Sequence, residues 1–319
     1  MKRKTFATAL CCVCSLFAGC EQVDDLNASG EDLRMSLVAG IGLSASRYAG
    51  NSPNEIVFAA NDVIGLKVNE EDFVQWKFDG AKWRTVGNAV YWEDKTSSHS
   101  FYAFYPYAAN ASLGNVPMPY LDGQDGSMAK LGKHDFLVAS KIQSYGDDGT
   151  VSFTDGNTFT HVSSLISLTI KGGGDLNNAS LSKISFRGTN LITSSTYSFE
   201  DKKIKLVNEN QDELSMALTN CVMSSGDKTF YFILNSGTVY LSAVTLSIHY
   251  TVDNVKYKAE KIGIQKDVND KFESGKRYDY IVTIVDNSLK MTGNEIKDWE
   301  AGNSLGNITI NGEKEETQS

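Results

Sequence analysis

The side chain with the most evident chemistry in this sequence is the thiol of Cys20, which ends the segment Phe17-Ala18-Gly19-Cys20. Three basic residues, 2–4, precede an uncharged stretch from Thr5 to Phe17, which is the order of an export signal with small residues before its cleavage site. As a helix that stretch would be only ~20 Å long, too short for a hydrocarbon core of ~30 Å. A cysteine directly after the cut is typical of a lipobox, in which the sulfur receives a diacylglycerol and the freed amine a third acyl chain.

The expected product of this signal is an exported protein held by lipid. Several acyl chains anchor a protein stably, whereas one holds it only marginally. Glu21, Asp24 and Asp25 follow Cys20 and resemble the acidic surface-export signals of such lipoproteins. We therefore expect lipid attachment at Cys20 and display on the cell outer membrane. An ordinary export signal with a chance cysteine is the alternative.

Charge and cysteine content narrow the possible functions. Residues 1–19 hold three of the 30 basic residues and none of the 39 acidic ones, so the mature part carries a net charge of −12. This balance argues against binding nucleic acid or anionic lipid headgroups. Beyond Cys20 the mature part has one cysteine, Cys221, and therefore no disulfide framework. We expect Cys221 to be a small buried hydrophobe, with a reactive thiol as the alternative.

Motifs for catalysis and metal binding are present only in fragments. Residues 302–306 match the hydrolase pattern G-x-S-x-G, but no His follows His249 and no Asp follows Asp298, so the later members of such a triad are missing. Residues 122–126 resemble the start of a calcium loop, but its twelfth position is Lys133 rather than Glu. The histidines show no metal spacing. We expect no enzyme, no metal and no cofactor.

The first half of the chain concentrates aromatic residues, including Trp76, Trp83 and Trp92. Exposed indoles would suit sugar binding, whereas buried ones would fill a β core. Most of these rings lie on alternating strand patterns, which favours the core.

The elements that must carry these residues are strands. Residues 20–32 are polar and acidic and are interpreted as a tether. From residue 33 onward apolar side chains alternate with others, at Leu33, Met35, Leu37, Ala39, Ile41 and Leu43. This period of two predicts a half-buried strand, weakened by Gly40 and Gly42.

Further strand patterns follow along the whole chain, with turn residues between them. Residues 73–78 and 82–86 are joined by Asp79-Gly80-Ala81, a hairpin signal. Many short strands at intervals of ~8–12 residues, without a convincing long helix, predict an all-β protein of sandwiches or barrels. About 300 mature residues suit two domains, which we place at 33–160 and 161–312, with a charged tail at 313–319.

An ordered set of segments resembles the fimbrillins, the FimA/Mfa-like pilins of type V pili. Each segment is a weak signal alone, but their order along the chain is fairly specific. They are Phe58–Leu66, Tyr91–Trp92 with Phe101–Tyr107, Asp135–Ala139, Phe159–Leu165, Phe272–Tyr280 and Ile296–Gly302. The resemblance implies two tandem transthyretin-like (Greek-key) β-sandwich domains, a lipoprotein precursor and a structural role in fimbriae or adhesion.

The resemblance also implies an assembly route. Shaft pilins of the family are trimmed by an Arg-specific protease after the first strand, and a strand from a neighbouring subunit fills the groove. Arg47 lies after the alternating segment and before Ile56, as this route requires; an ordinary exposed Arg is the alternative. The exchanged strand would be the alternating segment. The donor strand would contain Leu305, Ile308 and Ile310, unless these form the last strand of their own sandwich.

The function favoured is therefore that of a structural, non-enzymatic fimbrial subunit or fimbria-associated surface lipoprotein that serves adhesion. Its expected partners are other fimbrial subunits, the outer membrane through lipid, and host or bacterial surface glycans or proteins. The rival is a carbohydrate-binding surface lipoprotein that presents an exposed row of Trp76, Trp83 or Trp92. A glycosidase or protease is a distant third possibility.

Overall fold

The structure is a computed structural model that describes residues 33–41, 58–154, 156–173, 176, 178–264, 270–285, 288–298, 304–305 and 308–314, with the backbone alone described from residue 285 onward. The first strands are β1 (Ser36–Ala39), β2 (Val63–Val68), β3 (Val74–Phe78), β4 (Trp83–Thr85), β5 (Ser98–Tyr105), β6 (Val116–Pro117), β7 (Leu137–Ser144), β8 (Thr150–Phe153) and β9 (Thr160–His161). The next are β10 (Ser164–Ile170), β11 (Ser180–Thr189), β12 (Ser195–Ser198), β13 (Lys203–Leu206), β14 (Gln211–Val222), β15 (Lys228–Leu234), β16 (Thr245–Val252) and β17 (Val255–Ile262). The last are β18 (Lys276–Val285), β19 (Ser288–Asp298), β20 (Ser304–Leu305) and β21 (Ile308–Lys314). The described helices are short 3-10 turns: η1 (Met128–Lys133), η3 (Met223–Ser225) and η4 (Leu241–Ala243).

The N-terminal strands form two sheets that enclose one core, here called the N-terminal sandwich. One sheet has the order β4-β3-β2-β5-β7-β9, and the other pairs β1 with β8. The described members of the core lie between residues 33 and 159. They include Trp76, Trp83 and Trp92, whose exposed fractions are 2%, 7% and 2%. The expectation that the indoles fill a core is therefore confirmed.

The hairpin from β3 to β4 forms where the sequence predicts it. The Asp79 carboxylate accepts hydrogen bonds from the N–H groups of Lys82 (2.7 Å) and Ala81 (2.8 Å), and Gly80 has a φ of +101°. Glycine adopts this backbone conformation at little cost. The same N–H groups, that of Lys82 first, lower the pKa of the Asp79 carboxyl to about 2. The Asp79 side chain thus stabilises its own turn by hydrogen bonds to the backbone that follows it.

The C-terminal strands form a single sheet that folds over its own core, here called the C-terminal sandwich. The order is β14-β11-β16-β17-β21-β19-β18-β10-β15, with β20 beside β19. Phe186 on β11 contacts Phe232 on β15 with ring centroids 5.2 Å apart, so the two ends of the sheet face each other. The described core residues here lie between 166 and 284. An all-β sandwich fold is therefore confirmed, while the Greek-key, transthyretin-like connectivity and the division at residue 160 stay predictions.

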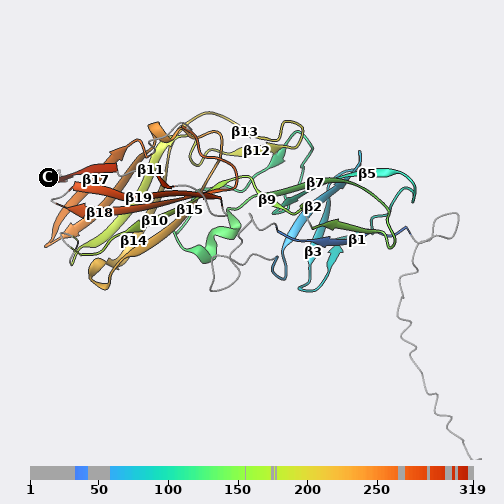
Figure 1. Cartoon of the computed structure of the whole chain (residues 1–319), viewed down its shortest axis with the longest axis horizontal. Helices are drawn as coiled ribbons and strands as arrows, with labels where there is room; N and C mark the ends of the chain where they lie inside the picture. The colour runs from blue at the N-terminus through green and yellow to red at the C-terminus, as the bar shows by residue number, and fades with distance from the viewer. Residues whose placement is uncertain are drawn as a thin grey trace, which may run out of the picture.

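A junction links the two sandwiches, and Figure 1 shows the β12–β13 hairpin above the space between them. β12 pairs with β13 and also with β6. In the chain, β6 lies between β5 and β7 of the N-terminal sandwich. Tyr197 and Phe199 of this hairpin pack on Phe104 and Phe136 in a separate cluster, the junction core. Gln124 adds a polar link, because its amide oxygen accepts the N–H of Ile233 (2.7 Å) and its amide nitrogen donates to the carbonyl of that residue (2.8 Å).

Candidate functional site

Among the described strands β1 has one ladder partner, β8, and its flanking residues bond to residues 90–92 and to Phe159. It pairs in parallel with β8, from Ser36 opposite Thr150 to Ala39 opposite Phe153. Two isolated bridges extend the contact, between Arg34 and Tyr91 and between Ile41 and Phe159. Backbone hydrogen bonds from Met35 to Val90 (2.8 Å) and from Trp92 to Leu33 (2.8 Å) hold the start of the segment, and one from Phe159 to Gly40 (3.1 Å) holds its end.

The side chains of β1 and its flanks alternate in burial, as the sequence predicts. Leu33, Met35 and Leu37 are 5–6% exposed, whereas Val38, on the opposite face of the strand, is 50% exposed. Ala39 and Ile41 are half-buried and pack against the same core. These apolar side chains fill a groove in the N-terminal sandwich.

The floor of this groove is aromatic and aliphatic. Val151 and Phe153 of β8 are fully buried, and the rings of Phe153 and Phe159 lie 5.6 Å apart in an edge-to-face arrangement. The Trp92 indole N–H donates to the carbonyl of Gly149 at 2.8 Å, which fixes the start of β8. The backbone N–H groups of Trp92 and Phe159 also donate to the carbonyls of Leu33 (2.8 Å) and Gly40 (3.1 Å), so these walls bond both to β8 or its core and to the segment of β1.

The two edges of β8 are satisfied by different partners. On one edge, the carbonyl of Phe153 accepts the N–H of Gly40 (3.0 Å) from the segment of β1. On the other edge, the Gln143 amide donates to the carbonyl of Thr150 (2.6 Å) and accepts the N–H of Ser152 (3.2 Å). Lys141 also donates to the carbonyl of Ser152 (2.6 Å), and burial lowers the pKa of this ammonium group. Side chains of β7 thus support β8 from the side away from β1.

The candidate donor strand lies in the opposite sandwich. Leu305 is in β20, opposite Asn294 of β19, while Ile308 and Ile310 are in β21, which runs between β17 and β19. Within this single chain these residues therefore form strands of their own sheet, the alternative that the sequence leaves open. Their donation to a second copy stays a prediction.

Three of the predicted site residues, Cys20, Leu43 and Arg47, lie outside the described residues. Over the part of the chain that the structure describes, no helix is long and apolar enough to span a bilayer. Lipid attachment at Cys20 and cleavage at Arg47 both stay predictions.

The other singled-out side chains have structural surroundings. His161 is buried, with Nδ1 2.8 Å from an Asp135 carboxylate oxygen, and His99 is buried with its ring 5.1 Å from that of Trp92. No cluster of three metal-ligating side chains occurs among the described residues. Cys221 is half-buried rather than fully buried, because it lies near the end of the edge strand β14; burial raises the pKa of its thiol.

The sequence did not predict that β8 is the partner of β1, or that Gln143 holds β8 in place. The alternation at residues 151–153 predicts a strand, but nothing local shows that it pairs in parallel with residues more than 100 positions earlier. Gln143 gave no signal either, because its role depends on the backbone of a later strand. The burial of the three indoles also removes the exposed aromatic row on which the carbohydrate-binding alternative depended.

Comparison with known proteins shows a family and a fold. A family model described as fimbrillin-like matches residues 47–299. None of the curated proteins compared with the chain matches it.

Several solved structures share the fold. A candidate cell adhesion protein from Bacteroides ovatus superposes with a TM-score of 0.61 at 19% identity, covering 85% of this chain and 99% of that one. One from Bacteroides uniformis gives 0.56 at 16% identity, covering 84% and 97%, and one from Bacteroides fragilis gives 0.50 at 10% identity, covering 90% and 98%. Since the family model spans most of the sequence and these folds extend over nearly the whole of their own chains, the chain belongs to the fimbrillin-like family.

Proposed function

We propose that this protein is a structural, non-enzymatic fimbrial subunit or fimbria-associated surface lipoprotein that assembles by β-strand donation and serves adhesion. The observation that carries the proposal is the geometry of β1, which has β8 as its one ladder partner among the described strands while its apolar side chains, and those of its flanks, are buried in the N-terminal sandwich. The flanks add backbone hydrogen bonds to residues 90–92 and to Phe159. An extended segment with the same alternation of apolar side chains can replace such a strand. Membership of the fimbrillin-like family supports the same role and a place at the cell surface.

The free energy available to such an exchange is considerable. Burial of Leu33, Met35 and Leu37 contributes roughly 1.5–3 kcal/mol for each side chain, or about 5–9 kcal/mol before the cost of ordering the strand. Because Gln143 and Lys141 bind the other edge of β8, the groove keeps part of its framework when β1 leaves. A donated strand therefore meets a groove whose walls are already built.

Cleavage after Arg47 would couple release from the membrane to opening of the groove. The segment removed would contain both Cys20, the proposed lipid site, and the whole of β1. Residues 304–310 of a neighbouring copy are the proposed donor, which requires them to leave their own sheet. Without cleavage, the same cysteine would keep the subunit anchored in the outer membrane, as a membrane-bound form of the same fold.

The test of this route starts from the mature chain with Cys20→Ser, which remains unlipidated. Incubation with an Arg-specific protease should give Tyr48 as the new N-terminal residue, followed by polymers that appear as a ladder on a gel run without boiling. Arg47→Lys keeps the positive charge but removes the cleavage site, so it should abolish the ladder. Arg34→Lys is the matched control and should leave it unchanged.

A competition measurement separates strand exchange from other modes of association. A synthetic peptide of residues 33–43 should block polymer growth by occupying the groove, and the same peptide with Leu37→Asp should not. Polymers that form equally well from the Arg47→Lys chain, or in excess peptide, would exclude the proposed exchange. Lipid attachment is tested separately by incorporation of a palmitate analogue in cells, which Cys20→Ala should prevent.

A further inference from the structure

A groove runs through the junction between the two sandwiches, beneath the β12–β13 hairpin. Its central cavity has a volume of about 920 Å³, within the range of sites that enclose small ligands, which often lie between domains. Hollows of about 500 Å³ and 710 Å³ adjoin it, one toward β7 and the other along residues 204–209, and each shares lining residues with the centre. These three adjoining hollows are here called the junction groove.

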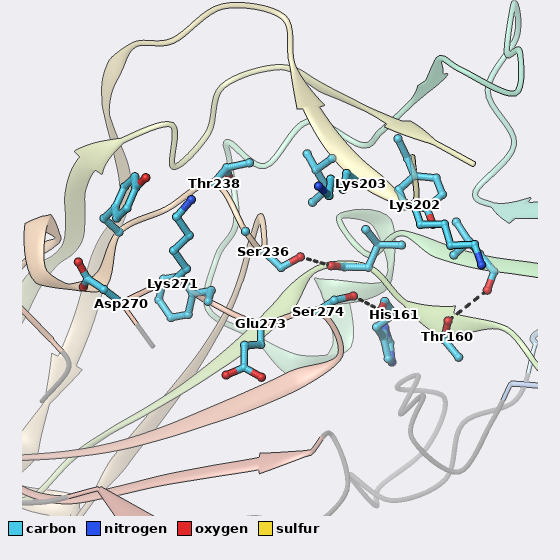
Figure 2. Close-up of a pocket in the computed structure, with 17 residues that line it drawn as sticks. Thr160, His161, Lys202, Lys203, Ser236, Thr238, Asp270, Lys271, Glu273 and Ser274 are labelled. Carbon is cyan, nitrogen blue, oxygen red and sulfur yellow. Dashed lines mark hydrogen bonds between the residues drawn. The ribbon is translucent and has the colours of Figure 1, made fainter. Parts of the chain in front are cut away.

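Lysine side chains dominate the charge of the junction groove. Five lysines and three carboxylates line it, in a chain with 39 acidic and 30 basic residues. Figure 2 shows Lys202 and Lys203 on one side of the central cavity and Lys271 on the other, with Ser236 and Thr238 between them. None of these three ammonium groups makes an ion pair with the described carboxylates. Lys205 is ion-paired with Asp201, so the positive charge of the groove comes mainly from Lys202, Lys203 and Lys271.

The walls of the groove are fixed in place by hydrogen bonds. The Ser236 hydroxyl donates to the carbonyl of Val162 (2.5 Å), and the Ser274 hydroxyl donates to the carbonyl of His161 (2.9 Å). The Lys271 ammonium lies 4.3 Å from the centre of the Tyr240 ring, in a cation–π contact. The Asp270 carboxylate accepts hydrogen bonds from the N–H and hydroxyl of Ser242, which turns one of the three acids toward the protein.

The backbone at Lys202 is a second and independent observation. Nine described residues other than glycine have positive φ, and eight of them are Asn or Asp; the ninth is Lys202, at φ +53° in the β12–β13 turn. Asn tolerates this left-handed conformation better than a long side chain does. A lysine held at such a position presents its charge over the groove at a cost in turn stability, which is a pattern found at functional sites.

Thr238 provides a third observation. Its hydroxyl oxygen is shielded from solvent and has no hydrogen-bond partner, although the residue lines both the central cavity and the hollow beside residues 204–209. A polar group buried without a partner costs free energy that a ligand can recover. The oxygen itself is closed to the cavity, so a ligand hydroxyl would complete this hydrogen bond once the Thr238 side chain turns toward the groove.

We propose that the junction groove binds an acidic oligosaccharide, with Lys202, Lys203 and Lys271 on its carboxylates and Thr238 on a sugar hydroxyl. A peptide strand suits the groove less well, since Lys203 and Lys205 lie on β13, an edge strand, and lysines on an edge oppose strand addition. Hydroxyls, ammonium groups and the half-exposed Tyr240 ring match a charged sugar chain. This site deepens the adhesive role proposed above, but it requires neither cleavage nor polymerisation.

The test uses calorimetric titration of the unpolymerised mature chain with Cys20→Ser. The probe is trigalacturonic acid, and its methyl ester is the matched neutral probe of equal size. Binding of the acid should weaken as salt rises from about 50 mM to about 500 mM, because exposed charges are screened, and the ester should not bind. Equal affinity for acid and ester, no binding of the acid, or tighter binding of hexaglutamate would each overturn the assignment.

Variants separate a binding role from a structural one. Lys202→Asn removes the ammonium group while suiting the left-handed backbone, so it should weaken binding about fivefold with an unchanged or raised melting temperature. Lys271→Gln should weaken binding by a similar factor, and Thr238→Val by less. Lys256→Gln, on an exposed lysine of β17, is the control and should have no effect. Affinity unchanged in both Lys202→Asn and Lys271→Gln would sink the proposal, whatever happens in the polymerisation assay.

Discussion

The segment of β1 and the β12–β13 hairpin are both short strands laid against a core, but they are attached in opposite ways. β1 has one ladder partner, β8, and its apolar side chains are buried in the N-terminal sandwich. β12 has a strand on each side, and its Tyr197 belongs to a core shared by the two sandwiches. Apolar alternation can be supplied by any similar strand, whereas the junction depends on particular neighbours. The comparison separates a strand with one ladder partner from a strand that is paired on both sides.

The largest effect is expected where β1 is most deeply buried. Leu37→Ala should lower the free energy of unfolding of the N-terminal sandwich by about 2–5 kcal/mol, because it leaves a cavity in a packed core. Urea unfolding followed by tryptophan fluorescence measures it, since three of the four tryptophans lie in that core.

Val38→Ala is the matched control for this measurement. Val38 is the next residue along the strand and is 50% exposed, so its loss should change stability by less than about 0.5 kcal/mol. Equal effects of the two variants would show that β1 is not held by its buried row.

The second effect tests the junction core from within a strand of the N-terminal sandwich. A Cβ added at Gly65 on β2 would come within 2.4 Å of the Phe104 ring, which belongs to the junction core. Gly65→Ala should therefore cost about 1–3 kcal/mol by overpacking. Because a strained junction core couples the two sandwiches less tightly, differential scanning calorimetry of Gly65→Ala should show them melting at separate temperatures.

Gly40→Ala is the counterpart beside β1. The nearest atom to an added Cβ there is 3.8 Å away, so the variant should be neutral or slightly stabilising. A large loss of stability in Gly40→Ala, or no loss in Gly65→Ala, would contradict the expected difference between the two regions.

The third effect concerns the polar link of the junction. Gln124→Ala removes hydrogen bonds to the N–H and carbonyl of Ile233 and to the carbonyl of Leu121. Leaving these buried groups unpaired should cost about 1–3 kcal/mol. Hydrogen exchange at the Ile233 amide is the direct measurement. Gln211→Ala, an exposed glutamine on β14, should leave that exchange rate unchanged.

The same contrast explains what the sequence reveals. The alternation at Leu33, Met35 and Leu37 predicts both the strand and its buried face, because a period of two is a local property. The hairpin at Asp79-Gly80 is local in the same sense. By contrast, β14 carries Glu213, Leu214, Met216 and Ala217, residues common in helices, and its strand state comes from pairing with β11. Tertiary contact overrides propensity there.

The candidate site also contains residues that the sequence pattern predicts and residues that it does not. The apolar residues of β1 are readable from their spacing, but their neighbour β8 is not, since parallel pairing across more than 100 residues leaves no local pattern. The junction groove is less readable still. Lys202, Lys271 and Thr238 lie far apart in the sequence, and each is unremarkable in its own segment. Only the packing of the hairpin over both sandwiches brings them together.

The smallest effect concerns the charge beside Gln124. The Asp125 carboxylate is 2.5 Å from the Lys130 ammonium, and this hydrogen bond, with those from Ser127, lowers the pKa of the carboxyl from 3.8 to about 2. The unfolded chain therefore takes up a proton near pH 4, while the folded chain keeps its charge until about pH 2. The stabilisation is full above about pH 4 and is lost as the pH falls toward 2.

Because the Asp125 side chain is 39% exposed, solvent screening limits this contribution to about 0.5 kcal/mol. Urea unfolding of Asp125→Asn should differ from the parent chain at about pH 7 and approach it at about pH 2. Asp253→Asn, at a turn that asparagine suits equally, should show no such convergence. A difference that persists unchanged to low pH would mean that the ion pair adds nothing to the stability of the folded chain.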